Sequence, residues 1–427
     1  MGFKELGVAC DFVCYTKHPF DYPETISNPR LILASTRLAK ITQGYSKFNP
    51  LKILLSTLSK SVAALWIFYA IFRYDVFIFG FGRSLLPLNL DLPILAMMGK
   101  KTIMNFAHGS DARAPYVNGA YQQQDGQEQL QADFLKTQTQ RIVRRYRRVE
   151  KGVSLVIGAP YSNSTFALKK YVNIFSIGIP CVARELMAGN VDPRVASVNA
   201  NQASTRMHAP VRILHSPSNP ASKGTVYIRR AVENLQKRGY SIDFHEITNR
   251  PNHEVLLEIQ ECDFVVDQIY SDSPMAAFAS EAASYGKPAV VGGYGLEPLK
   301  DHIPAHMLPP SLTCMPDEVE SAIAEMIDNV ELRLDLGERA RSFVRLQFSP
   351  TSVASRFMDI LHDQIPDEWW VDPLSIEYLH GFGQSDITTQ GNIRRLISVY
   401  GIHALKLGHR PKLESAFKSF ADSETLR

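Results

Sequence analysis

Short apolar runs alternate with amphipathic stretches along most of the chain, and this rhythm predicts strands separated by helices. In chain order, the strand candidates are 11–15, 75–80, 100–106, 152–158, 172–178, 211–215, 241–247, 262–267 and 287–293. The helices expected between them are 51–72, 132–150, 225–238, 252–261 and 274–285. Such alternation is typical of α/β proteins with parallel sheets. We therefore predict two Rossmann-like, parallel-sheet domains that face each other across a cleft.

A change in polarity divides this pattern. Residues 180–210 are polar, rich in small residues and only weakly periodic, which is typical of an interdomain linker. The interpretation places an N-terminal domain at 1–179 and a C-terminal domain at 211–365, with an extension at 366–427. A chain of 427 residues is also too long for a single hydrophobic core.

The most apolar stretch, 62–82, is interrupted by Arg73 and Asp75. Its uninterrupted part, 62–72, is about half of the roughly 20 residues that a membrane span requires. We therefore predict a buried helix followed by a core strand, and not a membrane span.

The composition is that of a soluble globular protein, with 45% hydrophobic and 21% charged residues. The net charge of +3 is nearly balanced, so no nucleic-acid partner is expected. The five cysteines form no C-x-x-C pair, which fits a reducing cytoplasm, and Cys262 is expected as a buried free thiol.

A basic cluster at 141–151, RIVRRYRRVEK, has two interpretations. It could contact nucleic acid or the inner face of an anionic membrane. Alternatively, because Ile142, Val143, Tyr146 and Val149 recur at helical spacing, the arginines form the solvated face of a packed helix. The second interpretation is favoured.

Ligands of open α/β sheets bind beyond the carboxyl ends of the strands, and several polar turns occupy such positions. The first is His108-Gly109-Ser110-Asp111, which follows the strand at 100–106. This turn could place an imidazole and backbone N–H groups in the cleft. The alternative is a turn that only caps a helix.

The second turn is HSPSNPASKGT, residues 215–225, between a strand and a helix. It lacks the glycine density of a phosphate-cradling loop. Lys223 could supply a point charge to a diphosphate, or it could be an ordinary exposed lysine. His215 and Ser218 are candidates for the same site, although Ser218 is equally expected as a turn residue.

The third turn follows the strand at 262–267. Ser273 precedes Pro274, the pattern of an N-cap and a first helical residue, and the helix tip could bind phosphate. Glu281 lies about two turns further along and could accept the hydroxyls of a ribose. The alternative is a solvated glutamate, but its apolar neighbours call for a partner.

The sequence lacks the motifs that are typical of several other functional sites. The chain contains no D-x-D, no Walker loop and no G-x-S-x-G. We expect neither a cofactor nor a bound metal.

Together these residues resemble a known family. HSPSNPASKGT, DFVVDQ and EAASYGKPAVV are similar to the donor-binding domain of retaining GT-B glycosyltransferases, in the glycogen-synthase and mannosyltransferase-like group known as family 4. The N-terminal HGSDAR resembles the acceptor-side motif H-G-S-D-x-R of that family. The resemblance covers roughly residues 5–350 and implies a GT-B architecture.

The resemblance also implies roles. Lys223 would bind the diphosphate of a nucleotide sugar, Glu281 its ribose, and His108 would lie near the transferred sugar. Many relatives carry an arginine where this chain has Ser218. The first glutamate of the family's E-x7-E pair falls at Ser273, with Asp272 beside it. Either Asp272 substitutes for that glutamate, or the sugar is contacted by backbone groups alone. The first strand of the family's N-terminal domain has no counterpart.

The resulting prediction is a cytoplasmic hexosyltransferase of polysaccharide biosynthesis. It would transfer a sugar from a nucleotide-diphosphate sugar to a glycan or lipid-linked acceptor, with retention and without a metal. One alternative is a catalytically silent GT-B relative that binds a nucleotide sugar or glycan, or supports a partner enzyme. The other is a sugar-nucleotide epimerase, for which acid and base residues are not evident.

Overall fold

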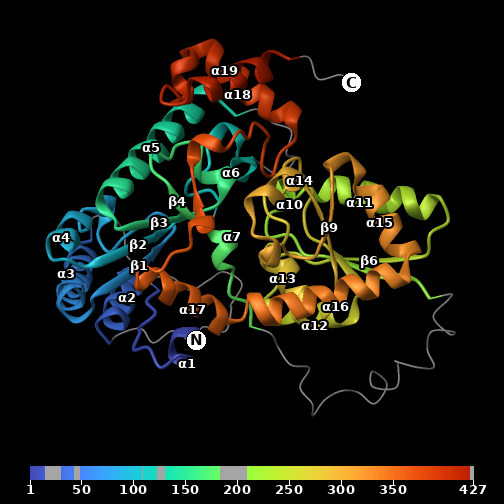
Figure 1. Cartoon of the computed structure of the whole chain (residues 1–427). Coiled ribbons are helices and arrows are strands. Elements are labelled where there is room, and N and C mark those ends of the chain that lie inside the picture. The colour runs from blue at the N-terminus through green and yellow to red at the C-terminus, as the bar shows by residue number, and fades with distance from the viewer. Residues whose placement is uncertain (15–29, 43–48, 108, 123–129, 183–208, 424–427) are drawn as a thin grey trace.

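Two α/β units, each built on its own five-stranded sheet, make up the molecule (Figure 1). The computed structural model describes residues 1–14, 30–42, 49–107, 109–122, 130–182 and 209–423. Strands within each unit are joined by helices and pair mainly in parallel. The predicted α/β class with two parallel sheets is therefore confirmed.

The first unit carries a sheet in the order β1-β2-β3-β4-β10. Its parallel strands are β1 (Val76–Gly80), β2 (Lys101–Asn105), β3 (Leu155–Gly158) and β4 (Tyr171–Asn173). The two-residue β10 (Trp370–Val371) pairs antiparallel with β4. The helices of this unit include α2 (Arg30–Thr42), α3 (Pro50–Arg73), α4 (Leu92–Met97), α5 (Ala132–Gly152) and α7 (Ile174–Ile177).

The second unit carries a sheet in the order β6-β5-β7-β8-β9, with every pairing parallel. Its strands are β5 (Val211–His215), β6 (Ile242–Glu246), β7 (Phe264–Val266), β8 (Ala289–Gly292) and β9 (Leu312–Cys314). The connecting helices are α10 (Pro220–Lys223), α11 (Thr225–Lys237), α12 (Asn252–Glu261), α13 (Ala277–Ser284), α14 (Leu296–Leu299), α15 (Val319–Asp328) and α16 (Val330–Gln347). Every residue of β7 and β8 is buried, as expected for central parallel strands.

After α16 the chain returns to the first unit. Helix α17 (Pro350–Leu361) packs against the short N-terminal α1 (Gly2–Glu5), and β10 then joins the first sheet. Helices α18 (Asp386–Tyr400) and α19 (Pro411–Asp422) follow, and α18 packs on both α5 and α19 (Figure 1). The extension predicted at 366–427 therefore adds to the first unit. Most of the linker predicted at 180–210 lies outside the described residues.

Two predicted strands differ from the structure. Residues 11–14 have no regular secondary structure, and residue 15 lies outside the described part of the chain. The strand predicted at 172–178 ends at Asn173, whose side chain accepts a hydrogen bond from the Phe175 N–H and starts the helical turn α7. Side-chain capping therefore overrides the apolar run that follows.

The prediction of a buried helix at 62–72 is wrong. By length and composition, α3 is the one helix of the described residues that could cross a membrane, and only 17% of its most apolar window is buried. Its buried residues are Ser59, Trp66, Ile67 and Ala70, whereas Phe68 and Phe72 are each 64% exposed. An apolar composition indicates that burial would stabilise a helix, but it does not show that other elements of the chain pack against all of its sides. Strand β1 does alternate in burial and joins the core.

The prediction for Cys262 is confirmed. The thiol is free and buried, and this burial raises its pKa to about 12. It is therefore an inert core group at neutral pH.

Candidate functional site

The turn that carries Lys223 is held in one conformation by a helix cap and a left-handed glycine. Asn219 caps α10 by accepting a hydrogen bond from the Ser222 N–H, and Gly224 ends that helix in the left-handed conformation with φ +73°. A Cβ added to Gly224 would lie 2.3 Å from Cγ1 of Ile269. Both the conformation and the close approach require glycine here. Gly224 therefore holds the turn in this conformation, and the turn sets the position of Lys223.

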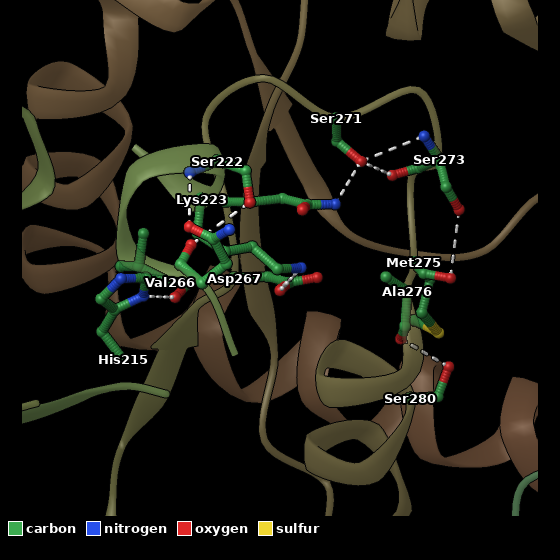
Figure 2. A network of polar contacts seen from close by, with 12 residues as sticks. His215, Ser222, Lys223, Val266, Asp267, Ser271, Ser273, Met275, Ala276 and Ser280 are labelled. Atoms are coloured by element: carbon green, nitrogen blue, oxygen red, sulfur yellow. Dashed lines mark hydrogen bonds and ion pairs between the residues drawn. The ribbon is translucent and has the colours of Figure 1, made fainter. Parts of the chain in front are cut away.

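Lys223 lies beside a buried carboxylate at the carboxyl end of β7. Its Nζ is 3.3 Å from Oδ1 of Asp267, whose side chain is only 1% exposed, while the lysine keeps 18% exposure (Figure 2). Oδ2 of Asp267 and Oε1 of the adjacent Gln268 are buried and have no hydrogen-bond partner among the described residues. The Lys223 ammonium and these unsatisfied acceptor oxygens thus lie close together. Such a combination suits a ligand that has both anionic and hydroxyl groups.

His215 is fully buried behind this pair. Nδ1 lies 2.8 Å from the Val266 carbonyl, to which it donates in the tautomer that satisfies both contacts, and Nε2 lies 2.9 Å from Oγ1 of Thr225. Burial lowers the pKa of His215 to about 4. The residue holds the β5 end, β7 and the start of α11 together. In this structure it acts as a positioning residue, and its predicted contact with a donor stays a prediction.

The buried histidine predicts an acid-dependent loss of stability. Because the folded-state pKa lies below the ordinary value near 6.5, the contribution of neutral His215 is complete above pH 6.5 and is lost as the pH falls towards 4. The full contribution is about 3 kcal/mol. In urea titrations, His215→Gln should show a flatter pH dependence than the wild type over this window. The exposed His306→Gln serves as the control, and equal slopes in wild type and His215→Gln would contradict the assignment.

The loop after β7 is pinned by Ser271. Its hydroxyl accepts hydrogen bonds from Nε2 of Gln268 at 2.6 Å and from the Ser273 N–H at 3.1 Å, and it donates to the Ser273 carbonyl (Figure 2). Its N–H donates to the Gly292 carbonyl at the end of β8. These bonds fix the path from Asp267 to Asp272.

The predicted start of the following helix is wrong. Helix α13 begins at Ala277 and has no side-chain cap, whereas Pro274 lies in the preceding loop. The Ser273 hydroxyl donates to the Met275 carbonyl instead. The hydrogen bonds of Ser271 hold Ser273 in a turn of the loop. The Ser273-Pro274 sequence therefore lies about one helical turn before the start of α13 and does not cap it.

The two units meet through a buried ion pair that sequence reasoning missed. Nη2 of Arg113, in the first unit, contacts a carboxylate oxygen of Asp272, and the two side chains are 5% and 11% exposed. The guanidinium also lies over the Phe382 ring, 3.8 Å from its centroid. Nη1 is buried without a hydrogen-bond partner among the described residues. The available signal was the arginine that ends HGSDAR, since a guanidinium that becomes buried needs an anionic partner.

The turn at 108–111 positions this arginine. His108 lies outside the described residues. Gly109 has φ +86°, and a Cβ there would lie 2.8 Å from Nη1 of Arg113, so glycine lets the guanidinium approach. Ser110 is exposed, whereas Asp111 is buried and its carbonyl accepts from Arg145.

A segment of the C-terminal extension, residues 380–386, lies between the two units, and we call it the bridging segment. The Gly383 N–H donates to the Tyr270 carbonyl of the second unit. In the other direction, the Phe382 N–H donates to the Val117 carbonyl, and the Phe382 carbonyl accepts from Gly119. A Cβ on Gly383 would lie 3.0 Å from Ser222, next to Lys223. The extension therefore lines the site.

Two further predicted residues lie on the loop before α10 and on α13. Ser218 is exposed on the loop before α10. Oε1 of Glu281 accepts a hydrogen bond of 2.9 Å from Nδ2 of Asn252 at the start of α12. The role predicted for Glu281 at a ribose stays a prediction. Within the described parts of the chain, no three His, Cys, Asp or Glu side chains gather as metal ligands.

The basic cluster at 141–151 forms one side of α5. Ile142, Tyr146 and Val149 are buried, while Nη1 of Arg148 donates to the Leu88 carbonyl at 2.8 Å. Burial lowers the pKa of Arg145, whose guanidinium packs inside the first unit. Several of these arginines thus stabilise the unit itself, which agrees with the favoured interpretation of a packed helix.

No family model matches the chain, and no curated protein matches its sequence. Among solved structures, the chain is similar to Anabaena Alr3699/HepE in complex with UDP, with 12% identity over 72% of this chain and 84% of that one, at a TM-score of 0.41.

Two further structures give similar values. A glycosyltransferase from Rickettsia africae ESF-5 shows 16% identity over 76% of this chain and 84% of that one, at a TM-score of 0.41. A UDP-forming trehalose-phosphate synthase from Burkholderia xenovorans shows 12% identity over 74% and 80%, at 0.43. At these values the similarities assign neither a family nor a function to this chain.

Proposed function

We propose that this protein is a GT-B glycosyltransferase that transfers a hexosyl group from a nucleotide-diphosphate sugar to a glycan or lipid-linked acceptor. The observation that carries the proposal is the position of Lys223. It stands at the carboxyl end of the second sheet, on a turn held by Gly224, beside unsatisfied acceptors of Asp267 and Gln268. This is where nucleotide ligands bind open α/β sheets. The resemblance of HSPSNPASKGT and EAASYGKPAVV to family 4 supports it.

In the proposed reaction, the Lys223 ammonium stabilises the negative charge that develops on the departing diphosphate. Asp267 holds the lysine in place through the 3.3 Å contact. The buried acceptors of Asp267 and Gln268 would receive donor hydroxyl groups. Retention of configuration is a further part of the proposal and rests on the family resemblance alone. The absence of a bound metal is another part, which rests on that resemblance and on the lack of a D-x-D motif.

The test is calorimetric binding of UDP, ADP and GDP to the protein and to Lys223→Ala. A charge-assisted hydrogen bond contributes about 1.5–3 kcal/mol to binding. Its loss in Lys223→Ala should therefore lower the affinity for the nucleotide diphosphate about 10- to 100-fold. Lys287→Ala is the matched control, because Lys287 lies before β8 at the opposite end of the same sheet, where its Nζ donates to the Cys262 carbonyl. No diphosphate binding by the wild type would contradict the donor site.

A second readout separates the enzyme from a silent relative. The wild type is incubated with nucleotide sugars, and release of free nucleotide diphosphate is measured with and without glycan acceptors. Release that depends on Lys223 supports a transferase. Tight binding with no release from any sugar nucleotide supports the catalytically silent alternative.

A further inference from the structure

The helical pair α2–α3 presents an apolar stripe to solvent. Six exposed apolar residues of α3 are spaced by three, four or seven positions, which places them along one side of the helix. They are Leu51, Leu54, Leu58, Leu65, Phe68 and Phe72, with exposed fractions between 44% and 64%. Ile53 and Tyr69, 57% and 51% exposed, lie beside this stripe. The stripe therefore runs along most of this 24-residue helix.

The opposite side of α3 is packed. Ser59 exchanges hydrogen bonds with Ser35 of α2, and Trp66, Ile67 and Ala70 are buried in the core of the first unit. At 100° per residue, these positions lie roughly opposite the stripe. Helix α3 thus has two apolar sides, one against its own protein and one against solvent. A buried anchor of this kind keeps the helix from leaving the unit, so crossing a bilayer would require unpacking that anchor.

The charge on the pair is of one sign. Every charged residue between 30 and 73 is basic, although the whole chain carries 46 basic and 43 acidic residues. Arg37 and Lys40 are exposed on α2, and Lys60 and Arg73 on α3. An exposed apolar stripe on a helical pair whose own charges are all cationic complements an anionic lipid surface, where acyl chains accept the stripe and headgroups accept the charges.

We propose that the outer face of α2–α3 binds the surface of an anionic membrane, with α3 lying in the interface plane. This surface differs from the basic cluster on α5, whose arginines are partly used within the unit. The proposal is independent of the donor site, so Lys223→Ala should bind vesicles as the wild type does.

The test is cosedimentation of the full chain with vesicles of phosphatidylcholine, with and without phosphatidylglycerol. We expect binding to the anionic vesicles that weakens with salt. Leu54→Ser, Phe68→Ser and Phe72→Ser combined should lower the partition coefficient by about 100-fold, because each exposed side chain contributes roughly a factor of five when it enters the interface. Arg37→Gln, Lys40→Gln and Lys60→Gln combined should remove most of the preference for anionic lipid.

The matched control combines Leu257→Ser, Leu334→Ser and Leu346→Ser, three leucines of the second unit that are 60–68% exposed. This variant should bind vesicles like the wild type. Phe68→Trp gives a second readout that keeps the stripe apolar. Its fluorescence should shift to the blue on anionic vesicles and be quenched by lipids brominated in their acyl chains, whereas Leu334→Trp should show neither effect.

Four outcomes would overturn the proposal. The wild type could fail to bind either vesicle, or the stripe variant could bind as well as the control. A wild-type dimer that the stripe variant converts to a monomer, without vesicle binding, would show that a second copy covers the face. Retention in the bilayer after an alkaline carbonate wash would contradict the interfacial arrangement.

Discussion

Arg113→Ala is expected to lower the free energy of unfolding by about 3–5 kcal/mol, because it leaves the Asp272 carboxylate buried without a counter-charge. Asp272 is 11% exposed, and the Arg113 guanidinium both pairs with it and lies over Phe382. The loss should be measured by urea unfolding at pH 7. Arg339→Ala removes a pair that is 56% and 63% exposed, so this control should cost less than about 1 kcal/mol.

The double variant Arg113→Ala with Asp272→Ala identifies the cause. If the cost comes from an unpaired buried charge, removing both partners should restore part of the stability lost in Arg113→Ala. Additive losses would instead indicate that the two side chains stabilise the protein independently. The same variants report on function, because this pair joins the units at the edge of the proposed donor site.

Gly224→Ala is expected to lower stability by about 2–5 kcal/mol and to weaken diphosphate binding at the same time. The left-handed conformation contributes roughly 1–2 kcal/mol of this cost, and overlap with Ile269 contributes the rest. The matched control is Gly239→Ala. Gly239 has φ +94°, but a Cβ there would meet no atom within 4 Å, so only the conformational cost should appear.

Ile269→Ala provides the internal check for Gly224. An added Cβ would lie 2.3 Å from Cγ1 and 2.7 Å from Cδ1 of Ile269, and the smaller side chain removes both atoms. The double variant should therefore be more stable than the sum of the two single losses predicts. A cost for Gly224→Ala no greater than for Gly239→Ala would show that the overlap is absent.

Much of the fold could be predicted from local pattern. The helices expected at 225–238 and 252–261 are observed at Thr225–Lys237 and Asn252–Glu261, and the strand at 211–215 is observed at Val211–His215. These segments have clear periodicity and clear ends. The start of α13 was missed because the loop from Ser271 to Ser273 is held by tertiary hydrogen bonds that override Ser-Pro at 273–274.

The candidate site was only partly visible in the sequence. The position of Lys223 at a strand end followed from the apolar run before it and the helical pattern after it. Its partner Asp267 lies 44 residues away, and the ion pair of Arg113 with Asp272 spans 159 residues. Pairs so distant arise only when sheets form and units dock, and no local spacing encodes them.

Local pattern was sufficient to predict the α/β class, the order of most strands and helices, and the Lys-Gly turn, because these depend on periodicity and on the conformational freedom of glycine. Long-range packing was needed to bring Arg113 to Asp272, to place residues 380–386 at the site, and to leave one side of α3 uncovered. Each of these depends on which distant surfaces meet. Apolar side chains are more stable when they are buried, but the packing of the whole chain decides which of them are covered. Those that it leaves uncovered, such as the outer side of α3, face solvent or a partner.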